Sequence, residues 1–208
     1  MVEDDRRLFD GGAGTNPFNR NFDHGRSLDD IPHIFHFTAV WAIPGPKLQG
    51  PLSRVLKGWE LTSITTWQSG FPFSVFSGVD NSFSGVGSDR ADFTGTNLSQ
   101  SRLSGLSHAQ EIQKFFNTSL LGPNVTGTFG NSGKNILRGP RFFDTDLGLI
   151  KDTSITERVK VQFRAEFFNV FNNVNFGNPG TTFGTPGFGK ITSAGDPRIL
   201  QLCLKFIF

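Results

Sequence analysis

The stretch QLCLKFIF, residues 201–208, alternates between apolar and more polar side chains. Successive side chains of an extended strand point to opposite faces, so every second residue shares a face. One face is wholly apolar and, extended by one residue upstream, comprises Leu200, Leu202, Leu204, Phe206 and Phe208. The other face comprises Gln201, Cys203, Lys205 and Ile207. The pattern predicts a β-strand with one apolar and one largely polar face.

Four earlier segments show the same period of two. They are residues 33–43, 58–67, 142–150 and 159–171. In the last of them Val161 and Phe163 fall on one side, whereas Lys160 and Gln162 fall on the other. The composition agrees, because the 25 Gly residues disfavour long helices and the 24 Phe residues suit a pleated sheet. We therefore expect an all-β, antiparallel, up-and-down fold of about five strands.

The expected strands are long, with about 9–13 residues each. Strands of globular proteins have about 5–6 residues, whereas a tilted strand that spans a membrane needs about 9–11. In such a strand the apolar face meets lipid and the polar face lines a wet lumen. The lengths favour a segment of a transmembrane β-barrel in the bacterial outer membrane, with outer-membrane lipid as a partner. Five strands leave that barrel incomplete, because bacterial single-chain barrels have an even number.

The connections between the strands are unequal in length. Residues 44–57 and 153–157 form the two shorter links, and residues 70–140 and 173–197 form two long ones rich in Gly, Ser, Asn, Pro and Phe. Outer-membrane barrels keep short turns on the periplasmic side and long loops outside. We expect residues 33–208 to be the C-terminal barrel strands with two external loops, and residues 1–32 to be an extracellular loop or tail remnant.

A soluble β-sheet module is the alternative, used for binding or adhesion. The same alternation describes a sheet with one face in a core and the other face in water. Strand length favours the membrane. An enzyme is not expected, because no nucleophile and base stand at a spacing that supports a reaction.

The charge and the cysteine count exclude several other classes. The net charge is +2, and no long run of Lys or Arg indicates a nucleic-acid partner. The single cysteine, Cys203, excludes an internal disulfide, and no cluster of Cys and His has zinc spacing. We expect no metal and no cofactor.

Several stretches also resemble one known family. They are HIFHFTAVWAIPGP (33–46), GWELTSITTWQSGFPFSV (58–75), NILRGPRFFDTDLGLIKDTSITERVKVQFRAEFFNVFNNVNFGNP (135–179) and FGKITSAGDPRILQLCLKFIF (188–208). Together they are similar to the C-terminal end of TonB-dependent outer-membrane receptors, in the subgroup with a carboxypeptidase-regulatory-like domain ahead of the plug. NVFNNVNF (169–176) and SAGDPRILQL (193–202) carry most of the likeness.

This resemblance implies a 22-stranded barrel, filled by an N-terminal plug, that takes up a scarce ligand with energy from the TonB complex. Siderophore, cobalamin, saccharide and peptide all remain open as the ligand. The resemblance also implies that the barrel-assembly machinery recognises the last strand, through Leu202, Leu204, Phe206 and Phe208. The sequence departs from the family in having no plug, no TonB box, no signal sequence and no Tyr. We therefore expect a C-terminal fragment or truncated reading frame that reaches the TonB complex only through a plug it lacks.

Polar residues on two of the expected strands form a first candidate site. If residues 153–157 form the turn, Asp146 lies opposite Arg164 and Asp144 opposite Glu166. We expect these four side chains to form a lumenal charge ladder rather than a carboxylate pair for acid–base chemistry, because polar lumens are typical of such barrels.

The long connection at residues 70–140 carries the second candidate site. Loops on a rigid scaffold often hold the ligand, so its charged residues are candidate ligand contacts. These are Asp80, Asp89, Arg90 and Asp92. A mobile lid without specificity is the alternative role for the same segment.

Overall fold

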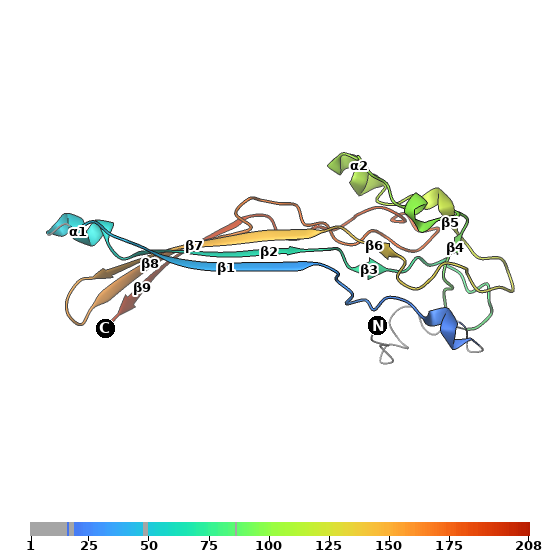
Figure 1. Cartoon of the computed structure of the whole chain (residues 1–208), viewed down its shortest axis with the longest axis horizontal. Helices are drawn as coiled ribbons and strands as arrows, with labels where there is room; N and C mark the ends of the chain where they lie inside the picture. The colour runs from blue at the N-terminus through green and yellow to red at the C-terminus, as the bar shows by residue number, and fades with distance from the viewer. Residues whose placement is uncertain (1–15, 17–18, 48–49, 86) are drawn as a thin grey trace. The chain divides into compact units, whose positions relative to one another are not determined.

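The computed structural model describes residues 16, 19–47, 50–85 and 87–208. Its main feature is a five-stranded antiparallel sheet in the order β1-β2-β7-β8-β9 (Figure 1). The strands are β1 (Ile34–Ile43), β2 (Trp59–Gln68), β7 (Phe142–Ser154), β8 (Lys160–Phe168) and β9 (Ile199–Ile207). The predicted all-β, antiparallel fold with long strands is confirmed. The barrel is not closed, because in the described chain β1 and β9 each pair with one strand.

The register joins the apolar faces of all five strands into one surface, which we call the apolar face. One continuous row across the sheet consists of Trp41, Leu61, Leu149, Ala165 and Leu202. The two ends of this row are exposed, at 57% for Trp41 and 63% for Leu202, whereas Ala165 between them is 6% exposed. A soluble protein buries such a surface, whereas a membrane strand leaves it to lipid.

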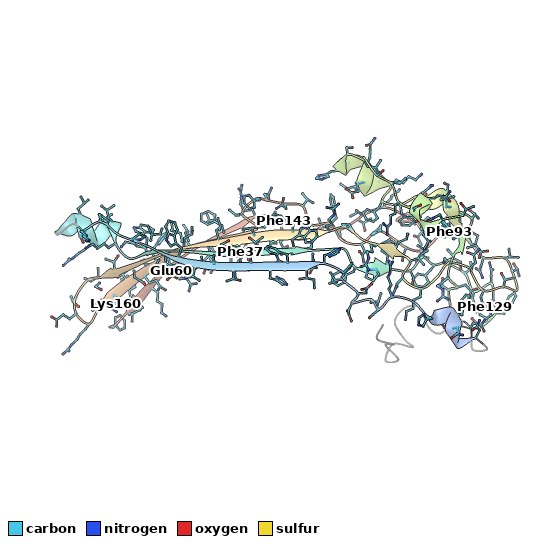
Figure 2. All side chains as sticks on the ribbon, in the orientation of Figure 1. Phe37, Glu60, Phe93, Phe129, Phe143 and Lys160 are labelled. Atoms are coloured by element: carbon cyan, nitrogen blue, oxygen red, sulfur yellow. The ribbon has the colours of Figure 1, made fainter. Side chains whose placement is uncertain are left out.

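The opposite side of the sheet, which we call the polar face, is mixed but carries most of the charged side chains. A neighbouring row across it consists of Ala42, Glu60, Ile150, Arg164 and Cys203. Figure 2 shows side chains standing off both sides of the sheet, with Phe37 labelled on β1 and Glu60 on β2. The register assigns Phe37 to the apolar face and Glu60 to the polar face.

Local backbone geometry sets where two of the strands begin and end. Asn169 has a φ of 49°, so β8 stops at Phe168 and the predicted strand at residues 159–171 extends three residues too far at its C-terminal end. Gly58 has a φ of 77° just before β2, and an added Cβ there would lie 2.5 Å from the carbonyl oxygen of Asp152. Only glycine fits that approach between the β1–β2 connection and β7.

The β1–β2 connection contains a short helix, α1 (Pro51–Leu56). The Trp59 indole N–H donates to the carbonyl oxygen of Val55 over 2.9 Å. The ammonium of Lys151, which projects from the apolar face of β7, donates to the carbonyl oxygens of Arg54 and Lys57. It also lies 5.6 Å from the centroid of the Trp59 ring. Two side chains of the sheet thus hold the C-terminal end of α1.

Replacing Lys151 with methionine should lower the free energy of unfolding by about 1–3 kcal/mol. The change leaves the α1 carbonyls without their charged donor, and hydrogen bonds to charged groups contribute about 1.5–3 kcal/mol. Removing the charge of a lysine that faces lipid near the interface stabilises the folded protein by only about 0–1 kcal/mol. Urea unfolding in lipid vesicles measures the difference, with Lys160→Met on the polar face as the control. Equal midpoints for the two variants would contradict this role.

The rest of the described chain forms a second compact unit, which we call the loop unit. It comprises residues 1–32, 69–140 and 176–194, of which the structure describes 16, 19–32, 69–85, 87–140 and 176–194. Its short elements are η1 (Arg20–Asp23), β3 (Pro72–Phe73), β4 (Asp92–Phe93), η2 (Leu98–Ser101), α2 (His108–Gln113), η3 (Thr118–Leu120), β5 (Leu121–Gly122) and β6 (Leu137–Arg138). None of the helices in the described part of the chain has the length and apolarity needed to cross a bilayer.

The loop unit has a hydrophobic core of its own. Its buried members are Phe73, Val75, Ala91, Phe116, Leu121 and Leu137. The ring of Phe116 lies 5.9 Å from that of Phe73 and meets Phe188 edge-on at 5.5 Å, so the two long connections share this core. The segments expected as external loops therefore pack together as a structured unit.

Candidate functional site

The four residues of the predicted charge ladder share the polar face, but the predicted pairing is wrong. Arg164 pairs with Ile150, and Glu166 pairs with Gly148. The hairpin loop is the cause. β7 continues to Ser154, which pairs with Lys160, so the loop spans residues 155–159 instead of 153–157. Asp146 and Arg164 lie on the same face without standing opposite one another.

Each member of the set has a different environment. Arg164 donates to Glu166 on its own strand over 2.7 Å. Asp146 accepts the backbone N–H of Asn169 over 3.0 Å and so fixes the end of β8. Within the described residues, Oδ1 of Asp144 is buried and has no hydrogen-bond partner. The polar face therefore carries one ion pair and separate carboxylates, and not a continuous ladder.

A row of three polar side chains that the sequence did not reveal lies on the same face. His36, Thr66 and Asp144 occupy matching register positions on β1, β2 and β7. The ring Nδ1 of His36 lies 3.1 Å from the hydroxyl of Thr66, within hydrogen-bond distance. No group of three or more His, Cys, Asp or Glu residues in the described chain is placed to hold a metal ion.

Strand β9 presents the four residues expected to carry the assembly signal. Leu202, Leu204 and Phe206 lie on the apolar face and pair with Ala165, Phe163 and Val161 of β8. They are 56–63% exposed, and Phe208, just beyond the strand, is 93% exposed. In the described chain, the other edge of β9 has no partner strand. The strand is thus free both to meet lipid and to pair with another strand.

Two of the four candidate ligand contacts in the loop unit are buried. Asp89 is 0% exposed and accepts hydrogen bonds from Ser82 and from the side-chain amide of Asn124, the latter over 2.8 Å. Arg90 is 2% exposed and pairs with Asp23 over 2.7 Å. Both charges hold the unit together from inside, so they are not placed to meet a ligand.

Arg90 ties the segment at residues 19–32 to the rest of the loop unit. Its guanidinium donates to the carbonyl oxygens of Phe22 and Ser132 and lies 4.2 Å from the centroid of the Phe22 ring. Burial lowers the pKa of Arg90, and the neighbouring carboxylate of Asp23 opposes that shift. The buried guanidinium is therefore paired on several sides.

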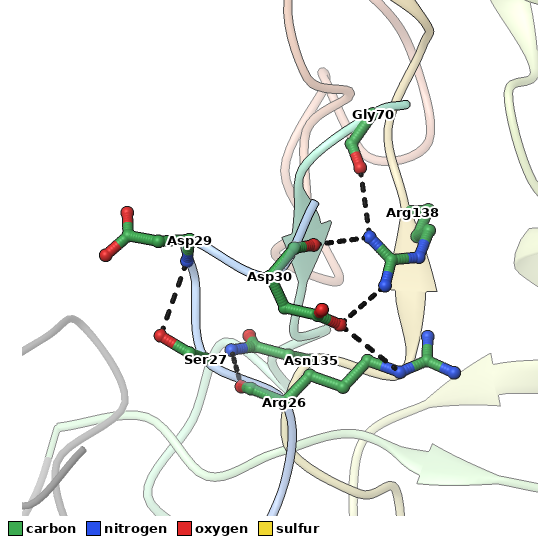
Figure 3. A network of polar contacts seen from close by, with 7 residues as sticks. All are labelled: Arg26, Ser27, Asp29, Asp30, Gly70, Asn135 and Arg138. Atoms are coloured by element: carbon green, nitrogen blue, oxygen red, sulfur yellow. Dashed lines mark hydrogen bonds and ion pairs between the residues drawn. The ribbon is translucent and has the colours of Figure 1, made fainter. Parts of the chain in front are cut away.

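A second polar network joins the same segment to the ends of the first long connection (Figure 3). Arg138 donates to the carboxylate of Asp30 and to its carbonyl oxygen, each over 2.6 Å, and to the carbonyl oxygen of Gly70 over 3.2 Å. The side-chain amide of Asn135 donates to the carbonyl oxygen of Arg26 over 2.7 Å. Residues 19–32, expected as a loop or tail remnant, are thus an integral part of the loop unit where the structure describes them.

The other two candidate contacts, Asp80 and Asp92, are half-buried. Asp92 accepts the backbone N–H of Asn131 over 2.8 Å. Asp80 accepts the backbone N–H groups of Ser84 and Gly85 over 3.1 and 2.9 Å. Both carboxylates stabilise turns, and their partial exposure leaves them as the polar candidates that a ligand could reach.

The turn at Asp80 should loosen in acid. Partial burial acts to raise the pKa of Asp80, but the hydrogen bonds from Gly85, Ser82 and Ser84 hold it below its ordinary value. A folded pKa below the unfolded one stabilises the turn above the unfolded value of about 3.9, and this stabilisation disappears as the pH falls through the folded pKa. Amide hydrogen exchange, corrected for intrinsic rates, should show lower protection at Ser84 and Gly85 in acid. Asp80→Asn should abolish that pH dependence, and unchanged protection of the unaltered protein would contradict the assignment.

Residues 3–201 match a family described as an outer membrane beta barrel domain. The chain belongs to this family. The match covers β1, β2, β7, β8 and the connections and ends within β9. It locates this outer-membrane β-barrel protein in the outer membrane of a bacterium. No curated protein and no solved structure matches the chain.

Membership of the family indicates which face of the sheet in this barrel protein should turn toward lipid. In outer-membrane barrels the outward face is apolar and the interior is polar. We therefore expect the apolar face to meet lipid, and the polar face with Asp144, Asp146, Arg164 and Glu166 to border the lumen. A soluble module, the alternative from the sequence, has no support from this comparison.

Proposed function

We propose that this chain supplies the C-terminal strands of a TonB-dependent receptor, which takes up a scarce ligand across the outer membrane. The observation that carries the proposal is where the structure puts the two stretches with most of the family likeness, residues 169–176 and 193–202. The side-chain amide of Asn169 donates to the carbonyl oxygens of Asn173 and Asp196 over 2.9 and 3.2 Å. The backbone N–H of Arg198 donates to the side-chain oxygen of Asn172 over 3.0 Å.

These contacts explain why asparagines stand at two positions of the stretch that carries the family likeness. Asn169 and Asn172 have φ values of 49° and 54°, a conformation that asparagine tolerates better than most residues. The NVFNN turn ends β8 and binds the segment that leads into β9. The two stretches that carry the family likeness are thus in contact where β8 ends and β9 begins. This contact supports treating them as one sequence signature.

The proposal assigns the parts of the chain to steps of uptake. The loop unit would meet the ligand, through groups such as Asp80 and Asp92, and the polar face would border the plug. Leu202, Leu204, Phe206 and Phe208 would be recognised by the barrel-assembly machinery, as the family resemblance implies. Coupling to the TonB complex would pass through a plug, which is not among the described elements. The proposal includes no catalytic activity, no cofactor and no nucleic-acid partner.

Uptake by intact cells tests the proposed function. Cells with and without the gene would be given labelled ferric siderophore, cobalamin, oligosaccharide and peptide, each with and without a protonophore that collapses inner-membrane energy. We expect at least one ligand to accumulate only when the gene is present and the membrane is energised. Gene-dependent accumulation that the protonophore does not change would argue for a passive channel. No gene-dependent accumulation of any of the four would equally contradict the proposal.

A further inference from the structure

We propose that α1 is a lipid contact, which lies in the headgroup region of the periplasmic leaflet with Leu52, Val55 and Leu56 inserted. The inference concerns a surface outside the proposed transport path, and it does not depend on which ligand is carried. It rests on the spacing and exposure of these side chains, on the face of the sheet that holds the helix, and on its continuity with the lipid-facing surface.

The helix sits at the end of the sheet where the shorter connections lie. The β1–β2 connection, the β7–β8 loop at residues 155–159 and the end of β9 share that end of the sheet, because Ile43 pairs with Trp59 and Lys160 pairs with Ile207. Short connections of outer-membrane barrels are periplasmic. This end therefore lies at the inner leaflet of the outer membrane.

Three apolar side chains of α1 are exposed. Leu52, Val55 and Leu56 stand at the i, i+3 and i+4 positions that share one side of a helix. Leu52 and Val55 are each 59% exposed, and Leu56 is 40% exposed. A helix of this length is only marginally stable in water, and exposing three apolar side chains to water does not stabilise it. Burying these side chains in a membrane interface does stabilise it.

The two side chains that hold α1 show which side of the barrel it is on. Trp59 and Lys151 form a cross-strand pair and share the apolar face with Leu61 and Leu149. Trp59 donates to the carbonyl oxygen of Val55, and Lys151 donates to that of Arg54 over 2.8 Å. α1 is therefore attached to the lipid-facing side of the sheet and not to the lumenal side. Its apolar residues continue a surface that already meets hydrocarbon.

The charges of the connection fit the same location. Arg54 is exposed and lies in the last turn of α1, and Lys57 follows the helix, so both cations would lie at the level of lipid phosphates. The adjacent cavity of about 640 Å³ is lined by Arg54 and Lys57 but also by Asp152 and Glu157. This mixed lining does not select an anion, so the contact we propose is with the lipid surface and not with a single bound headgroup.

Depth-dependent fluorescence quenching tests the contact in the protein as purified from outer membranes. In a Cys203→Ser background, single cysteines at Val55, Glu157 and Ala39 would each carry an environment-sensitive dye. The protein would be reconstituted in vesicles of phosphatidylethanolamine and phosphatidylglycerol with nitroxides either near the headgroup or near the end of the acyl chain. Ala39, on the apolar face near the middle of β1, reports hydrocarbon, and exposed Glu157 in the β7–β8 loop reports water.

We expect the dye at Val55 to be quenched about twofold more by the shallow nitroxide than by the deep one, since interfacial helices bury their apolar face only about 5–10 Å. The dye at Glu157 should be quenched by neither. If Val55 behaves like Glu157 while Ala39 is quenched, α1 is in water and the inference is wrong, although the barrel orientation stands. If neither the dye at Val55 nor the dye at Ala39 is quenched, both the inference about α1 and the orientation of the barrel are wrong. If the dye at Val55 is quenched by neither nitroxide but emits at a clearly shorter wavelength than the dye at Glu157, with Ala39 quenched, a protein partner covers α1 instead of lipid and the inference is equally wrong. None of these results depends on uptake of any ligand.

Discussion

Replacing Ala39 with arginine should destabilise the inserted protein by about 2–4 kcal/mol, the cost of a cation on the lipid-facing side near the bilayer midplane. Ala39 lies on the apolar face of β1 and pairs with Ser63. Alanine has almost no side chain to lose, so the measured cost is that of the new charge in hydrocarbon and not of lost packing. Urea unfolding in lipid vesicles, followed by the band shift between folded and heated protein, measures it.

The neighbouring residue provides the matched control. Val40 lies on the polar face and is 65% exposed, so Val40→Arg places the same charge toward the lumen. We expect that variant to change the free energy of unfolding by less than about 1 kcal/mol, the usual limit for a surface substitution. A larger loss for Val40→Arg than for Ala39→Arg would reverse the assignment of the two faces.

Replacing Arg90 with alanine should destabilise the loop unit by about 3–5 kcal/mol, which is the usual cost of breaking a buried ion pair by removing one partner. The change removes the 2.7 Å contact with Asp23 and the donors to Ser132 and Phe22. Limited proteolysis of the inserted protein should show faster cleavage within residues 69–140. The strands should stay protected, because their pairing does not involve Arg90.

Lysine at the same position separates charge from geometry. Arg90→Lys keeps the cation near Asp23 but cannot reproduce the three directions in which the guanidinium donates, so an intermediate cleavage rate is expected. Arg102→Lys, at a residue of the same loop unit with no buried ion pair among the described contacts, should leave cleavage unchanged. Cleavage of Arg90→Ala at the rate of the unaltered protein would show that this buried pair does not hold the unit together.

The strands and their faces could be predicted because they depend on local alternation. In Phe163, Arg164 and Ala165, for example, the period of two assigns each side chain to a face whatever strand lies alongside. The register could not be predicted in the same way. It depends on where the β7–β8 hairpin turns, and the backbone N–H groups of Ile155 and Thr156 both donate to the carbonyl oxygen of Val159, which places the loop two residues later than expected.

The loop unit and the attachment of α1 could not be predicted from the sequence for a different reason. Arg90 contacts Asp23 across 67 residues of sequence, and Arg138 contacts Asp30 across 108. A charged residue in a Gly- and Ser-rich segment gives no sign that its partner lies so far away. Lys151 is similar, since its place on an apolar face is explained by its contacts with Trp59 and with the carbonyl oxygens of Arg54 and Lys57 at the end of α1. Long-range pairs like these decided which candidate residues are buried.

The assignment of the apolar face to lipid is tested most directly by a spin-label scan of β9 in reconstituted membranes. Single cysteines from Leu200 to Phe206, in a Cys203→Ser background except at 203 itself, would carry a nitroxide. Collision rates would be measured with oxygen, which concentrates in hydrocarbon, and with a water-soluble nickel complex. We predict oxygen maxima at residues 200, 202, 204 and 206 and lower oxygen collision at the residues between them. Oxygen maxima at 201, 203 and 205, or no alternation at all, would contradict a sheet whose apolar face meets the membrane.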